Sequence, residues 1–381
     1  MTFFFGKLIF PGDGGSQLIG KLNRNNTSRY FCSRKTDDYF DMWLNLELLA
    51  PYVIECWIDN MKLIYDNVTR KSSNTAGVDI RTVDFGNTTS IDWLDPSKAS
   101  PGRYFIDISS SLTKLGLHRG VSIRGAPYDF RRAPNDLAEY LANMTQLVED
   151  TFHKNNNKKV VLVAHSMGCP TILYFLKVRS QSWKNKYIKC LVTLSGVYGG
   201  AVKALRTFAS GDNLSVVLIS PRTLRQEQRT FPSLAFLLPS DKFWNSSEVL
   251  IQTSKKNYTV QDYKQFFTDI DFMNGYYMWQ DTSALINDLK PPGVELHCLH
   301  GVSVPTEESM IYKEGYFPNY QPTKVLGDGD GTVNLRSLEG CLRWKNSSKQ
   351  KVYHQTFPKV DHMNILRHEP VLQYIDNLVK S

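Results

Sequence analysis

The sequence has no apolar run that approaches the roughly eighteen residues needed for a membrane-spanning helix. It also lacks zinc-type cysteine spacing, basic runs with interleaved aromatic residues and RNA-binding signatures, so we expect no nucleic-acid partner despite a net charge of +8. The positive charge would equally suit an anionic membrane surface. These absences favour a soluble or peripheral protein, and 381 residues suffice for one large α/β domain with insertions or for two domains.

The N-terminus lacks the features of a secretory signal, because residues 1–7 contain no basic leader, long apolar core or small-residue cleavage site. We therefore expect residues 3–10 to form the first strand. The glycine-rich loop at residues 11–16 lacks the Gly-Lys-Ser/Thr ending of a phosphate-binding loop and does not follow G-x-G-x-x-G. It is compatible with a tight turn and with backbone N–H groups that face an anion.

Six cysteines allow fifteen complete pairings, and spacing alone does not choose among them. Asn-x-Ser/Thr sequons begin at Asn25, Asn26, Asn67, Asn87, Asn143, Asn213, Asn245, Asn257 and Asn346. This density favours the secretory route and, with it, disulfides. Asn67, Asn245 and Asn257 are the glycosylation candidates.

The segment from Val160 to Cys169 is a β-branched run that ends in a serine among small residues. It predicts a buried parallel strand that turns sharply into a helix, with Ser166 at the tip as a nucleophile. Gly168 fits the G-x-S-x-G pattern, whereas Ala164 replaces its first glycine. In the alternative interpretation, Ser166 only caps the following helix.

The region between Cys32 and Cys56 is rich in large apolar residues but too short and polar to span a bilayer. A disulfide between these two cysteines would hold it as a projecting hairpin of helices. Trp43, Leu48, Leu49 and Trp57 would then form a membrane-touching patch. A mostly buried core helix is the alternative.

The central segments alternate strand and helix patterns, which predicts a mostly parallel sheet with crossovers. The charges of residues 123–132 are expected to form structural pairs. Between about residues 199 and 244 the periodicity fails, which suggests an irregular lid. Residues 236–238 in this segment could pack on acyl chains or in an ordinary core.

A second informative segment, residues 325–334, delivers Asp328 and Asp330 into a glycine turn. A calcium loop beginning at Asp328 is disfavoured, because its sixth position needs glycine and holds Val333. The better interpretation gives one carboxylate the task of orienting an imidazole, and we favour Asp330. No metal or cofactor is expected.

Three histidines follow Asp330, and a Ser-Asp-His order requires one of them as the base. His354 is expected in a strand and His368 in the final helix, so both are better explained as structural residues. His362 falls in a loop between these elements, where a partly exposed catalytic imidazole is expected.

These segments together resemble the lecithin-cholesterol acyltransferase and lysosomal phospholipase A2 family over nearly the whole chain. The segments that support the resemblance are residues 11–13, 43–47, 56–60, 124–129, 164–168, 209–213 and 327–334, together with Cys298. The sequences of residues 131–135 and 327–331 are more similar to the lysosomal phospholipase branch than to the cholesterol-esterifying branch.

The resemblance implies an α/β-hydrolase fold with a membrane-binding excursion and a lid. It implies a triad of Ser166, Asp330 and His362, and an oxyanion hole formed by the backbone amides of Asp13 and Met167. It further suggests the disulfides Cys32–Cys56 and Cys298–Cys341, with Cys169 and Cys190 as buried free thiols. Lys203 and Thr332 are possible substrate contacts. Residues 195–200 and the loop after Asp13 depart from the family's sequence pattern, so the resemblance does not define the detailed shape of the pocket.

The chain would divide into five parts. They are the start of the hydrolase core with the oxyanion loop (1–31), the disulfide-stapled membrane-binding excursion (32–75), the core with the nucleophile (76–200), the lid or cap region (201–290) and the core with the catalytic Asp and His (291–381).

The resemblance also implies a serine phospholipase and acyltransferase that passes an acyl group to water or to a lipid alcohol such as ceramide. Its partners would be a phospholipid surface, preferably anionic, and a lipid alcohol acceptor, in the lysosome or outside the cell. One alternative is a phosphatidylcholine-sterol acyltransferase. An alternative from another class is an inactive lipid-binding protein.

Overall fold

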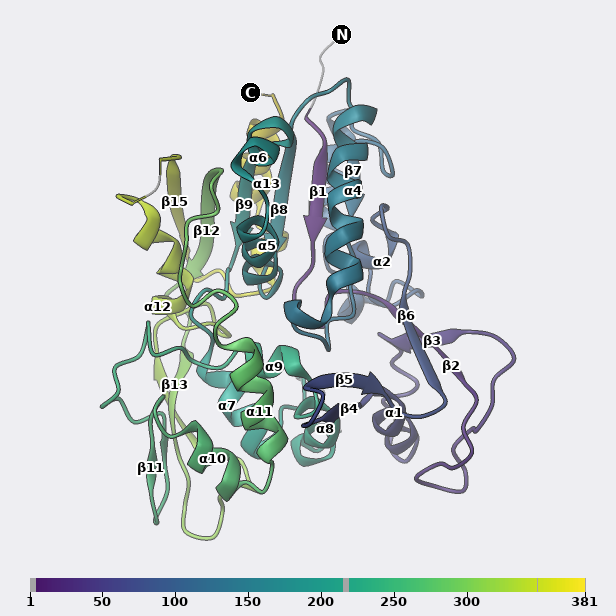
Figure 1. Cartoon of the computed structure of the whole chain (residues 1–381), viewed down its shortest axis with the longest axis vertical. Helices are drawn as coiled ribbons and strands as arrows, with labels where there is room; N and C mark the ends of the chain where they lie inside the picture. The colour runs from purple at the N-terminus through teal and green to yellow at the C-terminus, as the bar shows by residue number, and fades with distance from the viewer. Residues whose placement is uncertain (1–4, 215–218, 348, 381) are drawn as a thin grey trace.

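A computed structural model describes residues 5–214, 219–347 and 349–380 of the chain (Figure 1). At its centre lies a six-stranded sheet in the order β15-β12-β9-β8-β1-β7, in which every neighbouring pair is parallel. The strands are β1 (Lys7–Phe10), β7 (Ile123–Gly125), β8 (Val160–His165), β9 (Ile188–Leu194), β12 (Glu295–Val302) and β15 (Val352–Pro358). The predicted mostly parallel sheet is confirmed. The first strand begins later than predicted, and residues 3 and 4 lie outside the described residues.

The central sheet is covered by helices on both faces, which explains why β8 is apolar throughout. Successive side chains of a strand point to opposite faces, so Val161 and Val163 join one hydrophobic cluster while Val160 and Leu162 join another. The helices on one face, in front of the sheet in Figure 1, are α4 (Ala138–Lys154), α5 (Gly168–Lys177) and α6 (Gln181–Tyr187). Those on the other face are α2 (Thr89–Asp92), α3 (Ile106–Lys114) and α13 (Glu369–Lys380).

The order of the strands creates a crevice beside β1. The chain passes from β1 to β7 on one side and then returns to place β8 on the other side of β1. In open parallel sheets, a site forms outside the carboxyl ends of the strands at such a reversal. The loop after β1 and the turn after β8 therefore meet at the same edge of the sheet.

Residues 18–82 form a smaller antiparallel region beside this edge (Figure 1). Its elements are β2 (Leu18–Leu22), β3 (Phe40–Trp43), α1 (Val53–Met61), β4 (Leu63–Asp66), β5 (Lys71–Asn74) and β6 (Val78–Thr82). The disulfide Cys32–Cys56 ties the loop before β3 to α1, which confirms this pairing. The expected hairpin of helices is wrong, because the region contains one helix and three strand pairings.

The predicted membrane patch of the excursion (residues 32–75) is also wrong in its membership. Trp57 is 1% exposed and Leu49 is buried, while Trp43 and Leu48 are partly buried against the same core. The Trp57 indole also donates a hydrogen bond to the Met42 carbonyl at 2.8 Å. These side chains face inward because β2, β3 and β6 supply a local core. The large apolar side chains exposed in this range are instead Leu46, Tyr52, Val53, Ile64 and Val68, and Tyr30 and Phe31 are exposed just before it.

The expected irregular segment at residues 199–244 is largely helical in its described part. The predicted cap region (201–290) contains, in its described part, α7 (Val202–Ser210), α8 (Pro221–Gln228), α9 (Pro232–Phe236), α10 (Tyr263–Asp269) and α11 (Met273–Thr282). A second sheet joins its strands β10 (Ile251–Gln252) and β11 (Asn257–Tyr258) to β13 (Thr306–Ile311) and β14 (Thr323–Gly327), which lie beyond residue 290. Proline at the start of α8 and of α9 divides the segment into short helices, which explains why the sequence shows no long helical periodicity there. Leu238 packs in the core of the cap region, whereas Phe236 and Leu237 are partly buried.

The remaining described helices are short. They are α12 (Leu335–Leu338) and the 3-10 turns Ser100–Gly102, Pro134–Asp136, Glu339–Trp344 and Asn364–Leu366. Among the described residues, no helix has both the length and the apolar content needed to cross a bilayer.

The remaining cysteines and the charged loop follow the predictions. The disulfide Cys298–Cys341 is present, and Cys169 and Cys190 are buried free thiols. The charges of residues 123–132 also form structural pairs, as predicted. The pairs are Arg124–Asp150, Arg131–Asp129, Arg132–Asp129 and Arg132–Asp136.

Candidate active site

The turn between β8 and α5 holds Ser166 in a left-handed backbone conformation, with φ of 55°. Its N–H donates to the Leu194 carbonyl at 3.0 Å, which ties the turn to the neighbouring strand. Gly168 allows the close packing that this turn needs, because a Cβ atom there would lie 2.5 Å from the Pro11 carbonyl oxygen. The strained turn thus projects the serine above the sheet edge.

Ser166 lies at one end of a continuous hydrogen-bonded triad. Its Oγ is 2.9 Å from His362 Nε2, and His362 Nδ1 is 2.7 Å from Asp330 Oδ2. The His362 backbone N–H also donates to the Asp330 carbonyl at 2.8 Å. All three side chains are buried although they come from three separated segments. This arrangement can move a proton from the hydroxyl to the imidazole.

Asp330 is held as a carboxylate by its surroundings. Burial alone would raise the pKa of Asp330, but His362 and the N–H groups of Val333 and Thr332 lower it below its ordinary value. These N–H groups donate to Asp330 Oδ1 at 2.8 and 3.1 Å. Asp328 instead accepts bonds from the Ser303 and Gly329 N–H groups. The geometry therefore pairs His362 with Asp330 and gives Asp328 a role in the turn.

The other two histidines considered as bases lie elsewhere. His354 Nε2 is 2.8 Å from His300 Nε2. The His368 ring packs against Phe357, and its carbonyl accepts bonds at the start of α13. Their contacts agree with the structural roles expected for them.

The loop after β1 packs directly on the nucleophile turn. A Cβ atom on Gly12 would lie 2.7 Å from Ser166 Cβ and 3.0 Å from the His165 carbonyl oxygen. Asp13 follows Gly12, and Met167 precedes the first residue of α5. N–H groups at the start of a helix lack intrahelical partners, so the Met167 amide is suited to bind an oxyanion.

Asp13 has an unusual electrostatic setting for a residue that solvent can reach. Its side chain is exposed at the surface, yet desolvation by the neighbouring protein groups raises the pKa of Asp13 to about 6 despite the nearby Lys203 ammonium and the bond from the Gly14 N–H. Lys203 Nζ lies 3.4 Å from Asp212 Oδ2, which Arg206 also binds. The charge of Asp13 therefore changes near pH 6.

Sequence analysis missed two buried polar residues beside the triad, Tyr104 and His165. His165 Nε2 is 2.9 Å from the His362 carbonyl oxygen, and His165 Nδ1 is 2.7 Å from Tyr104 Oη. The one available signal was a histidine directly before the nucleophile at the end of an apolar strand. Nothing in the sequence near Tyr104 indicates this contact.

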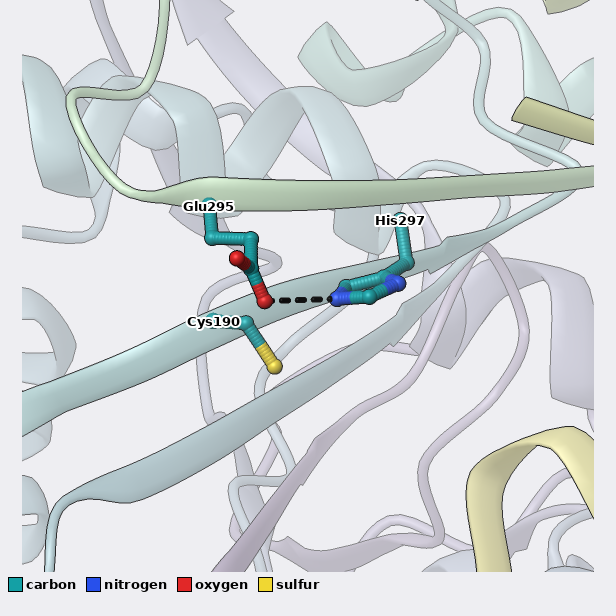
Figure 2. A group of neighbouring side chains, drawn as sticks. All are labelled: Cys190, Glu295 and His297. Atoms are coloured by element: carbon teal, nitrogen blue, oxygen red, sulfur yellow. Dashed lines mark hydrogen bonds and ion pairs between the residues drawn. The ribbon is translucent and has the colours of Figure 1, made fainter. Parts of the chain in front are cut away.

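One group of side chains away from the triad has donor atoms of the kinds that bind metals. Cys190, Glu295 and His297 lie together on β9 and β12 (Figure 2). His297 Nε2 is 3.1 Å from Glu295 Oε1, and its Nδ1 is 2.7 Å from Tyr374 Oη. Lys7 is buried beside Cys190, and its Nζ has no hydrogen-bond partner. Both ring nitrogens of His297 are already engaged by Glu295 and Tyr374, so these residues fit a hydrogen-bonded core group better than a metal centre.

Comparisons with known proteins find matches over most of the chain. The sequence profile of the family described as lecithin:cholesterol acyltransferase matches residues 39–369. The chain is 44% identical to the human lysosomal phospholipase A and acyltransferase, over 98% of this chain and 90% of the relative. It is 42% identical to the chicken phosphatidylcholine-sterol acyltransferase, over 94% of this chain and 86% of the relative.

A solved structure, the Tle4-Tli4 complex, contains a chain of similar fold. The TM-score is 0.54 at 13% identity, and the match covers 99% of this chain and 97% of the other. At this identity the similarity concerns the fold alone.

Proposed function

Because the chain belongs to the lecithin:cholesterol acyltransferase family and has the α/β-hydrolase fold, we propose that it is a serine phospholipase and acyltransferase. The observation that carries the proposal is the chain of contacts from Ser166 Oγ to His362 and on to Asp330, at 2.9 and 2.7 Å. An inactive lipid-binding protein would not need three buried polar side chains that are hydrogen-bonded in this order.

In the first half of the reaction, His362 Nε2 takes the proton of Ser166 as its Oγ attacks the ester carbonyl of a glycerophospholipid. The backbone amides of Asp13 and Met167 stabilise the oxyanion. The tetrahedral intermediate collapses, His362 returns the proton to the leaving lysolipid oxygen, and the acyl group stays on Ser166.

In the second half, an acceptor hydroxyl gives its proton to His362 and attacks the acyl-serine. The bond between the acyl carbon and Ser166 Oγ then breaks, and His362 returns the proton to Ser166 Oγ. Water as the acceptor gives a fatty acid, and a lipid alcohol gives an acylated lipid. The 44% identity to a relative named for both activities supports both outcomes. The partly exposed Lys203 and Thr332 adjoin Asp13 and Asp330 respectively, which supports roles in contact with substrate.

Membrane contact is proposed for the exposed apolar side chains Tyr30, Phe31, Leu46, Tyr52 and Val53. Apolar side chains in water gain free energy when they enter the interface of a bilayer. The net charge of +8 supports a preference for anionic lipids, since Lys and Arg near such a surface contribute about 1 kcal/mol each.

A lysosomal or secreted location is proposed on separate grounds. The relatives include proteins named as lysosomal, and the two disulfides fit an oxidising route. Asn67, Asn245 and Asn257 are exposed, which supports them as glycan acceptors. The proposed parts 32–75 and 201–290 serve as the membrane-binding excursion and the cap.

The test offers phosphatidylcholine liposomes that contain both a short-chain ceramide and cholesterol, at acid and at neutral pH. We expect acylceramide and free fatty acid, with Ser166→Ala forming neither. Cholesteryl ester as the main product at neutral pH would favour the sterol acyltransferase alternative. The basis of this alternative is the identity of 42% and 36% to two relatives named phosphatidylcholine-sterol acyltransferase.

A further inference from the structure

We propose that Tyr104 and His165 are positioning residues that hold the oxyanion loop and the His362 loop in register with Ser166, an inference that rests on the proposed function. The two side chains form one continuous hydrogen-bond chain between the loops. Gly12 N is 2.9 Å from Tyr104 Oη, Tyr104 Oη is 2.7 Å from His165 Nδ1, and His165 Nε2 is 2.9 Å from the His362 carbonyl oxygen.

The direction of every hydrogen bond in this chain can be assigned. A carbonyl oxygen only accepts, so His165 Nε2 carries a hydrogen and donates to His362. Burial lowers the pKa of His165 to about 3, and the neighbouring His362 adds to this effect, so the ring is neutral. Nδ1 of a neutral Nε2–H tautomer must accept, which makes Tyr104 the donor. The Tyr104 oxygen in turn accepts from the Gly12 N–H.

Burial gives each of these bonds its importance. Tyr104 is 3% exposed and His165 is 1% exposed, so bulk water cannot replace a lost partner. A buried donor or acceptor left without a partner bears its full desolvation cost. The chain therefore favours one arrangement of the two loops over nearby alternatives.

Each end of the chain fixes a group that the proposed reaction uses. At one end, the bonded Gly12 immediately precedes Asp13, whose N–H is proposed to hold the oxyanion. At the other end, the bonded carbonyl belongs to His362, and the rings of His165 and His362 lie 4.8 Å apart. His165 itself immediately precedes Ser166. One pair of side chains thus connects the nucleophile, the base and the oxyanion loop.

The chain also prevents His165 from acting as a competing base. A second imidazole close to His362 could draw off the proton that Ser166 releases. Both nitrogens of His165 are already occupied, one as a donor and one as an acceptor. The transferred proton therefore stays on His362 Nε2, where the leaving group needs it.

The main test uses Tyr104→Phe, which removes one oxygen and little volume, with Tyr140→Phe as the matched control. Tyr140, which lies on α4, likewise donates its hydroxyl to a buried acceptor, but this acceptor is the Ala126 carbonyl and not a histidine beside the triad. On a soluble short-chain ester we expect Tyr104→Phe to lower kcat by about ten- to hundredfold, because misplaced catalytic groups have effects of this size. KM should stay close to that of the control. The melting temperature should fall further in Tyr104→Phe than in Tyr140→Phe, because the first variant leaves two buried groups without a partner and the second leaves one.

A long-chain alkyl boronic acid measures the positioning role directly, because its adduct with Ser166 imitates the tetrahedral intermediate. The affinity of Tyr104→Phe for this probe should fall by about the same factor as kcat. At the other residue, His165→Gln keeps a donor near the Nε2 position, so it should retain more kcat than His165→Ala. If kcat and boronate affinity of Tyr104→Phe match those of Tyr140→Phe within twofold, the positioning role is overturned.

The wild-type protein gives an independent measurement if the His165 variants do not fold. In ¹⁵N-histidine NMR, His165 should remain the neutral Nε2–H tautomer from pH 4.5 to pH 8. Titration of its ring within this range, or an Nδ1–H tautomer, would refute the assigned chain. Activity that survives in Ser166→Ala would instead refute the proposed function, so the two failures are distinguishable.

Discussion

The active edge of the central sheet and the predicted excursion of residues 32–75 differ in which side chains they bury and which they expose. At the edge, the polar side chains of Ser166, Asp330 and His362 are buried and bonded to one another. In the excursion, Tyr52 is 80% exposed although it is largely apolar. Buried polar groups that bond to one another indicate a site that is complete within the protein. Exposed apolar groups indicate contact with a second surface, which we propose to be a lipid bilayer.

The largest expected effect sharpens the first half of this comparison. Asp330→Asn should lower kcat by about 10⁴-fold, because the amide cannot hold the imidazole in the productive tautomer. Asp328→Asn is the matched control, since Asp328 contacts only the turn through the Ser303 and Gly329 N–H groups. It should retain activity within about tenfold of wild type. Equal losses in both variants would remove the assignment of Asp330.

The next effect concerns a residue of the excursion that points inward. Trp57→Ala should reduce the free energy of unfolding by about 3–5 kcal/mol, because the fully buried indole leaves a cavity and its bond to Met42 is lost. Tyr52→Ala should change it by about 0.5 kcal/mol or less. Denaturant unfolding of both variants measures the contrast. A Trp57→Ala protein as stable as wild type would show that this side chain is not part of the core.

A smaller effect is expected from the Asp13 side chain in the oxyanion loop. Since desolvation raises the pKa of Asp13 to about 6, the group is neutral below that pH and becomes a carboxylate as the pH rises through it. A negative charge there opposes the oxyanion, so wild-type kcat should fall by about tenfold between pH 5 and pH 7. Asp13→Asn should lose this step and stay active at neutral pH. Identical pH profiles for the two proteins would contradict the electrostatic account.

The smallest effect tests the exposed half of the comparison. Replacing Tyr52 and Val53 together by Ser should weaken binding to phospholipid vesicles by about five- to tenfold, because about 1 kcal/mol of interfacial burial is lost. Activity on a soluble ester should not change. Val178→Ser is the control, since Val178 is an exposed apolar residue beyond α5. Vesicle sedimentation measures all three proteins, and equal binding would argue against contact through Tyr52 and Val53.

The two regions also differ in how far their sequences predict them. A strand, a sharp turn and a helix are encoded within residues 160–177, so the position of Ser166 follows from local pattern. His362 could be separated from His354 because His354 lies in the strand β15, whereas the prediction that His368 lies in the final helix is wrong, since His368 directly precedes α13. The positions of these residues at one edge follow from the parallel order of the strands.

Burial in residues 32–75 was harder to predict, because whether a side chain is buried or exposed depends on residues that are distant in the sequence. Trp57 and Tyr52 are both aromatic residues near one disulfide, yet one is buried and the other exposed. Trp57 lies within α1 and packs in one cluster with residues of β2, β3 and β6, whereas Tyr52 lies before the helix begins and outside this cluster. Tyr104 was missed for the same reason, since its contact with His165 joins residues 61 positions apart.

The central claim is that Ser166 carries the acyl group, and mass spectrometry of the quenched enzyme tests it most directly. After mixing with phosphatidylcholine vesicles, wild-type protein should show an acyl mass on the proteolytic peptide that contains Ser166, and Ser166→Ala should show none. Addition of a short-chain ceramide should lower the acylated fraction as acylceramide appears. An acyl group on another residue, or turnover by Ser166→Ala, would contradict the account.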